Sequence, residues 1–99
     1  MKIIKTYSEL EQVIKVREEK IVIVEGLAEE INDKFTSDDP RIYGAIDETI
    51  SLPGTLVNML FGSVNIFNTL LLIKKEYDFD YNEDSNQVFL ILKDEFKRK

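Results

Sequence analysis

The side chains that could do chemistry in this chain are few in kind. The sequence contains no His and no Cys, so it lacks the commonest general base, the usual zinc ligands and every thiolate nucleophile. Any reaction would have to use carboxylates, lysine amines, or the hydroxyls of Tyr, Ser and Thr. No catalytic motif is found among them. We therefore expect no catalytic residue, no metal site and no cofactor, and the sequence favours a protein that is not an enzyme.

The polar residues best placed to converge follow two predicted strands. β-Branched residues are concentrated at 3–4 and 21–24, which predicts a strand at each place. In parallel α/β units, ligands bind beyond the carboxyl ends of the strands. The candidate ligand pocket therefore consists of Tyr7, Ser8, Glu25, Gly26, Asp38 and Asp39. The glycine-rich phosphate-binding pattern is absent, so Gly26 is first interpreted as a turn residue and Ser8 as a helix cap.

A second polar cluster lies near the C-terminal end of the sequence. Five residues alternate in the manner of calcium ligands, namely Asp78, Asp80, Asn82, Asp84 and Asn86. A calcium-binding loop also needs Gly at its sixth position and a bidentate Glu at its twelfth. Those positions hold Glu83 and Phe89. The cluster is therefore interpreted as a solvated strand face and turn.

The first quarter of the sequence predicts a βαβ unit over about residues 2–25. Ser8 and Glu11 have the spacing of a capping box, and an amphipathic helix is predicted from Glu9 to Glu19. The run Ile21–Val24 is typical of a strand that is buried on both faces. The two strands should therefore be parallel, with a right-handed crossover. The face of the helix that turns inward is predicted to hold Leu10, Val13, Ile14 and Arg17.

Three helices are predicted in the middle of the chain, over about residues 27–73. The first ends near Phe35, and the second begins with Asp39 as its N-cap and Pro40 at its first helical position. The third and longest is predicted to run without interruption over 55–73. The apolar residues that mark the first two helices recur every fourth position, and they are Leu27, Ile31 and Phe35, then Ile42, Ile46 and Ile50.

The last quarter of the sequence predicts an antiparallel β-hairpin over about residues 75–93. A strand is predicted from Lys74 to Tyr81, where Tyr77, Phe79 and Tyr81 alternate with Asp78 and Asp80. A turn follows at 82–86, and the apolar run 88–92 predicts a strand covered on both faces. We therefore expect one domain over residues 1–99, of α/β or α+β class. Its predicted element order is β-α-β-α-α-α-β-β, with a mixed sheet.

The most informative feature for function is a stretch without charge. Thr49 to Ile73 contain no charged residue in 25 consecutive positions, although 32% of the chain is charged. On a helical wheel, the polar residues of this stretch gather on one narrow side. Three interpretations stay open: a helix in the protein's own core, an interface of a symmetric homodimer, or contact with a membrane. The candidate interface residues are Asn58, Gly62, Asn65, Asn68 and Thr69.

The charge balance limits the possible partners. The formal net charge is −6, from 19 acidic and 13 basic residues, and phosphate backbones and anionic lipids repel a protein of this sign. We therefore expect no nucleic-acid partner and argue against a membrane. The first residues lack the apolar run of a secretory signal, so a cytoplasmic location is expected.

The leading functional hypothesis is a non-enzymatic interaction or self-assembly module that uses the uncharged helix 55–73 to bind a protein partner or a second copy. The alternative is a small-ligand-binding protein, or an enzyme that uses the carboxylates Glu25, Asp38 and Asp39 with Tyr7 at the strand ends. A membrane-associated protein is the third hypothesis. The sequence does not identify a ligand.

Overall fold

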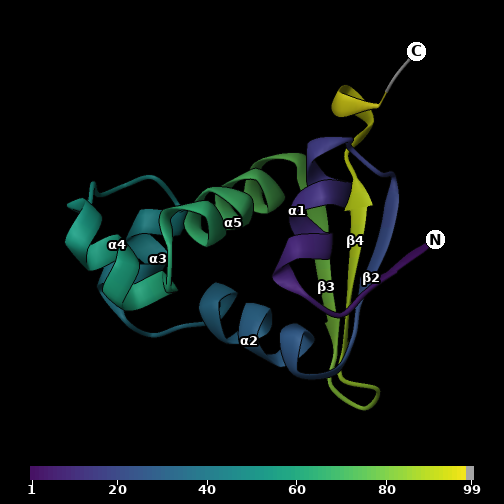
Figure 1. Ribbon diagram of the computed structural model, residues 1–99, viewed down its shortest axis with the longest axis horizontal. Helices are drawn as coiled ribbons and strands as arrows, with labels where there is room; N and C mark the ends of the chain where they lie inside the picture. Colours follow the sequence, from purple (N-terminus) through teal and green to yellow (C-terminus); the bar gives the residue numbers. More distant parts are fainter. Residues whose placement is uncertain (98–99) are drawn as a thin grey trace.

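The N-terminal part of the chain forms the predicted βαβ unit. In the computed structural model, which describes residues 1–97, β1 (Lys2–Ile4) and β2 (Lys20–Ile23) pair in parallel and are connected by α1 (Tyr7–Lys15) (Figure 1). Val24 N also donates a hydrogen bond to Ile4 O at 3.0 Å, which extends the pairing by one residue. The parallel start of the sheet was therefore predicted correctly.

Helix α1 begins two residues earlier than predicted because a different hydroxyl caps it. Glu9 N donates to Thr6 Oγ1, and Thr6 N donates to Glu9 Oε1, each at 3.2 Å. This reciprocal pair is a capping box, and the predicted box of Ser8 with Glu11 does not form. Both candidate pairs have the same sequence spacing, so only the position of the helix start distinguishes them.

The predicted place of Arg17 on the inward face of this helix is wrong. Helix α1 ends at Lys15, and Arg17 has a left-handed φ of 53° in the loop that follows. Its guanidinium forms two hydrogen bonds with the buried carboxylate of Glu76, Nε to Oε1 at 3.3 Å and Nη2 to Oε2 at 3.1 Å. Arg17 therefore ties the loop to a distant helix instead of filling the core.

The next two helices lie close to their predicted positions. Helix α2 spans Glu25–Phe35 and helix α3 spans Pro40–Ile46. Asp39 caps α3 as predicted, since its carboxylate accepts a hydrogen bond from Arg41 N at 2.9 Å. Ile50 was expected to continue the apolar face of α3, but it lies beyond the end of the helix and is exposed.

The predicted long helix is broken into two. Helix α4 spans Gly54–Phe61 and helix α5 spans Val64–Glu76, and the two are bent by 78° relative to each other. Four helices therefore follow the βαβ unit instead of three. In Figure 1, α3 and α4 lie at the same end of the molecule, whereas α5 packs on α1 and leads back to the sheet.

The hairpin completes a four-stranded sheet. Strands β3 (Tyr77–Asn82) and β4 (Gln87–Leu92) are antiparallel, and β4 also pairs antiparallel with β2. The strand order is β1-β2-β4-β3, so the sheet is mixed and the class is α+β. Strand β3 begins later than predicted because α5 continues to Glu76. A short 3₁₀ helix, η1 (Asp94–Phe96), follows the hairpin.

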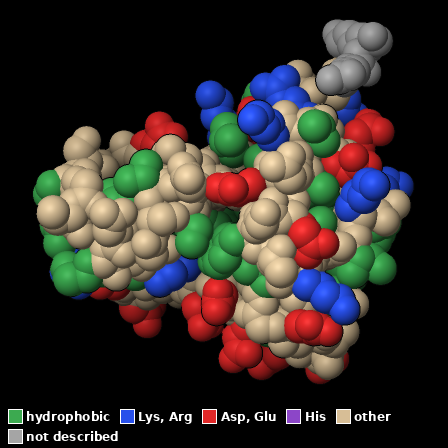
Figure 2. Space-filling model, in the orientation of Figure 1, with side chains coloured by type: hydrophobic (Ala, Val, Ile, Leu, Met, Phe, Trp, Pro, Cys, Tyr) green, Lys and Arg blue, Asp and Glu red, His purple; other side chains and the backbone are tan. Residues whose placement is uncertain are grey.

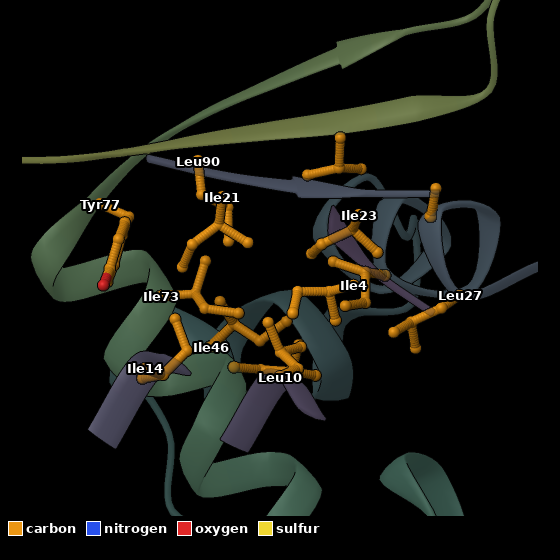
Figure 3. Close-up of a cluster of buried hydrophobic side chains, with 14 of the residues drawn as sticks. Ile4, Leu10, Ile14, Ile21, Ile23, Leu27, Ile46, Ile73, Tyr77 and Leu90 are labelled. Atoms are coloured by element: carbon orange, nitrogen blue, oxygen red, sulfur yellow. The ribbon is translucent and has the colours of Figure 1, made fainter. Parts of the chain in front are cut away.

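The core lies between one face of the sheet and the helices. Figure 3 shows strand side chains such as Ile21, Ile23 and Leu90 pointing towards Leu10 and Ile73 on the helices. These five side chains are fully buried. Burial of this kind contributes about 1.5–3 kcal/mol for each large apolar side chain. The fold is therefore held by a single apolar layer.

The prediction that β4 is covered on both faces is wrong. Figures 1 and 3 show the helices on one side of the sheet, and no described helix covers the other side. On that open face Ile91 of β4 is 37% exposed and Ile3 of β1 is 63% exposed. Val22, on the strand β2 that lies between β1 and β4, is buried. An apolar run in the sequence predicts burial on both faces, but a sheet can still leave one face uncovered when all its crossover helices pack on the other.

Candidate interaction surface

The bend between α4 and α5 has a local cause. Gly62 has a φ of 93°, a conformation that residues with a Cβ rarely adopt, and it ends α4. Ser63 then caps α5, because its hydroxyl accepts a hydrogen bond from Ile66 N at 3.1 Å. A glycine that ends one helix followed by a serine that begins the next is a signal that sequence reasoning could have used.

Long-range contacts hold the bend at a fixed angle. The rings of Phe61 and Phe67, one from each helix, lie 4.7 Å apart between centroids. The ammonium of Lys34 on α2 donates a hydrogen bond to Leu60 O at 2.7 Å and lies 5.9 Å from the centre of the Phe61 ring. A cation at the C-terminal end of a helix is stabilised by the helix dipole. The bend is therefore preorganised.

Both helices of the bend expose uncharged faces. The exposed residues on α4 are Gly54, Thr55, Asn58 and Met59, and those on α5 up to its last turn are Val64, Asn65, Asn68 and Leu72. The half of the molecule that contains α3 and α4 shows few charged side chains in Figure 2, in contrast to the half that contains the sheet. The uncharged stretch of the sequence is thus in large part a surface.

The structure distributes the five candidate interface residues over both helices. Asn58, Gly62, Asn65 and Asn68 are exposed, whereas Thr69 is buried and donates its hydroxyl hydrogen bond to Asn65 O at 2.9 Å. The polar stripe of a straight helix therefore does not form. We define the elbow surface as the exposed residues around the bend, namely Asn58, Gly62, Val64, Asn65 and Asn68.

A groove of about 400 Å³ lies between the bend and α2. We call it the elbow groove. The bend contributes Met59, Leu60 and Ile66 to its lining, and α2 contributes Glu30, Asp33 and Lys34. One bank of the groove is therefore apolar, and the other, the acidic bank, carries two acidic side chains and one basic side chain. Sequence reasoning missed it because the two banks are about 30 residues apart and meet only through tertiary packing.

Tyr7 lies in the elbow groove without the other five residues of the predicted ligand pocket. Burial, together with the negative charge of Glu30, raises the pKa of Tyr7 to about 12. The phenol therefore stays protonated near neutral pH and is not poised to act as a base. It can only donate or accept a hydrogen bond there.

The other predicted pocket residues make local contacts. Glu25 forms an exposed ion pair with Lys5 at 3.7 Å, and Ser8, Gly26 and Asp38 are exposed. The carboxylate of Asp39 is bound by its own helix: hydrogen bonds from the Arg41 side chain and backbone lower its pKa. Of these residues only Asp39 caps a helix: Ser8 lies inside the first turn of α1 and Gly26 inside the first turn of α2, so their interpretations as a helix cap and a turn residue are wrong.

The buried carboxylate of the protein is also paired. Glu76 is 5% exposed, and Arg17 neutralises it with the two hydrogen bonds already described. Arg17 is stacked in turn on the ring of Phe96 at 5.3 Å. Among the described residues, no group of three or more acidic side chains is arranged to hold a metal ion. The geometry therefore directs attention to surfaces.

Within the described chain, no single helix is long and apolar enough to cross a bilayer, and α4 and α5 reach the necessary length and composition only as a bent pair. Comparisons with protein-family models, with curated proteins and with solved structures find no match to this chain.

Proposed function

We propose that this protein is a non-enzymatic assembly module that binds a second copy of itself through the elbow surface. The observation that carries the proposal is the exposure of uncharged faces on both α4 and α5, within a chain of which 32% is charged. The cores of protein interfaces are depleted in charged residues relative to the remaining surface. The elbow surface has that composition.

The net charge favours this surface over others for self-association. Each copy carries a formal charge of −6, so two copies repel each other at long range. Contact through an uncharged surface adds no further like-charge pair at close range.

The polar groups of the elbow surface suit a two-fold interface. In a symmetric dimer the same patch of each copy faces the other, so each amide can lie opposite another amide. An Asn side chain both donates and accepts hydrogen bonds, and Asn65 and Asn68 lie three residues apart on one face of α5. Gly62 has no side chain and allows close approach. Val64, which is 46% exposed, supplies apolar contact.

Light scattering on a size-exclusion column, in buffer without detergent, tests the proposal. We expect the wild-type chain to have a mass of at least two copies of the 11.5 kDa monomer. Val64→Lys and Asn65→Asp should lower that mass, because each would place an unpaired charge in the interface. Val16→Lys is the matched control, since Val16 is also an exposed valine but lies on the loop after α1.

Other outcomes would contradict the proposal. A wild-type chain that is monomeric at every concentration rules out self-association. An oligomer whose mass Val64→Lys and Asn65→Asp leave unchanged places the interface elsewhere. Aggregation that only detergent relieves would favour a membrane-associated protein instead.

A further inference from the structure

The elbow groove has an apolar lining on one side and acidic side chains on the other, whereas the elbow surface has no charged side chain. We infer that this groove is a docking site for a segment of another protein that is both apolar and basic. The groove and the elbow surface meet at Gly62, but the other side chains that define the elbow surface, Val64 and Asn65 among them, do not line the groove. The inference can therefore be tested separately from self-association.

The apolar bank of the groove is open to a partner. Met59 is 67% exposed, and Leu60 and Ile66 are half-buried beside it. The volume of about 400 Å³ falls within the range of about 300–1,000 Å³ that is common for binding pockets. In Figure 2, hydrophobic side chains gather at the junction between the charge-poor half and the rest of the molecule.

The acidic bank of the groove carries two exposed carboxylates, those of Glu30 and Asp33. Glu30 and Asp33 lie three residues apart and therefore share one face of α2. Both are exposed, and within the described part of the chain neither forms an ion pair. Lys34, the nearest cation along the helix, is bound to Leu60 O. Because Lys34 also lines the groove, the two acidic side chains and this ammonium give the acidic bank a formal charge of −1, with both carboxylates exposed to an incoming cation.

The combined chemistry selects the kind of occupant. A segment that fits must present apolar side chains to the bend and lysine or arginine side chains to α2, which is the pattern of a basic amphipathic helix. A second copy of this chain carries a charge of −6, and anionic lipid is also negative, so both are repelled from the acidic bank. A cationic segment is attracted from a distance.

Fluorescence anisotropy with a designed peptide tests the inference. The probe is a labelled peptide of about 14 residues, with leucines at the helical spacing of groove-binding segments and lysines elsewhere. The comparison peptide keeps the leucines and replaces every lysine by glutamate. We expect the lysine peptide to bind and the glutamate peptide not to bind.

Neighbouring residues on α2 provide a matched pair of variants. Glu30→Lys should weaken binding of the lysine peptide by about five- to tenfold, because a favourable charge contact becomes a repulsive one. Glu29→Lys changes the net charge by the same amount on a residue that does not line the groove, and should leave binding within about twofold. Met59→Lys should abolish binding through loss of the apolar contact.

The outcomes separate this inference from self-association. Val64→Lys should disrupt the oligomer and keep the affinity for the lysine peptide, so either proposal can fail alone. Equal weakening by Glu29→Lys and Glu30→Lys would show attraction by net charge only and overturn the docking site. Binding of the glutamate peptide as tightly as the lysine peptide would overturn it as well.

Discussion

Thr6 shows how a single hydroxyl determines where a helix begins. Thr6 and Ser8 are both good N-cap residues, and each has a glutamate three positions later. The chain uses Thr6 because its extended backbone lies directly after β1, so the helix starts as soon as the strand has ended. Ser8 is then inside the first turn, exposed to solvent.

Replacement of each hydroxyl tests this assignment. We expect Thr6→Ala to lower the free energy of unfolding by about 1 kcal/mol, because the backbone N–H of Glu9 loses its acceptor. Ser8→Ala should change it by less than about 0.5 kcal/mol, since alanine is favourable inside a helix. Urea denaturation followed by circular dichroism measures both. The reverse order of the two effects would show that Ser8 is the cap.

Arg17 illustrates a residue whose role depends on contacts far along the chain. Its helical spacing from Leu10, Val13 and Ile14 suggested an inward position, but its partner Glu76 is 59 residues away. A carboxylate that is 5% exposed would be costly without such a partner. The pair therefore joins the loop after α1 to the end of α5.

At the scale of the element, the bend at Gly62 converts one long helix into two surfaces. Without it, the polar residues from Asn58 to Thr69 would form one stripe, and the apolar residues would form the opposite side. With it, Thr69 turns inward, Asn65 and Asn68 stay exposed, and a groove opens beside α2. The functional surfaces of this protein depend on that backbone conformation.

The glycines at the two ends of α4, Gly54 at its start and Gly62 at its C-terminal cap, give a matched test of this dependence. Gly62→Ala should destabilise the protein by about 1–3 kcal/mol, because a residue with a Cβ is strained at a φ of 93°. The added Cβ would be 3.6 Å from Ile66 Cδ1, an ordinary contact, so the cost comes from the backbone. Gly54→Ala, where an added Cβ meets no atom within 4 Å, should be neutral or stabilising by about 0.5 kcal/mol. Thermal or urea unfolding distinguishes them. Equal effects would contradict a special role for Gly62.

At the scale of the whole molecule, charge is distributed unevenly. The half of the molecule that contains α3 and α4 shows few charged side chains, the acidic residues of α2 border the bend at the elbow groove, and the acidic hairpin turn lies away from it (Figures 1 and 2). The molecule measures 35 × 33 × 21 Å, which is comparable to the Debye length of about 30 Å at low ionic strength of about 0.01 M. Two copies in contact therefore repel each other across their whole extent when the salt concentration is low.

Ionic strength should act in opposite directions on the two proposed contacts. Raising it from about 0.01 M to about 0.1 M shortens the Debye length to about 10 Å. Self-association through the uncharged elbow surface should then strengthen, because only the long-range repulsion is screened. Binding of the lysine peptide to the elbow groove should weaken, because its attraction to Glu30 and Asp33 is screened. Sedimentation and anisotropy at the two salt concentrations measure these effects, and a self-association that weakens with salt would indicate an interface built on charge pairs.

Local signals in the sequence determined much of the fold. The β-branched runs predicted the parallel pair of β1 and β2, the Asp39-Pro40 pair predicted the start of α3, and the alternation before Asn82 predicted the hairpin. These features depend on residues close together in the chain, and their energetics are therefore visible in the order of the amino acids. The uncharged stretch that supplies the proposed interface was also evident from composition alone.

Only the tertiary structure decided where those elements meet. The 78° angle of the bend, the uncovered face of the sheet, the Arg17–Glu76 pair and the elbow groove all depend on contacts between segments far apart in the sequence. Residue order carries the preference for a bend at Gly62 and Ser63, but tertiary contacts hold its angle: Phe67 packs on Phe61 across the bend, and Lys34 of α2 binds the end of α4. Such long-range packing is the sum of many weak contacts, and no local pattern encodes it.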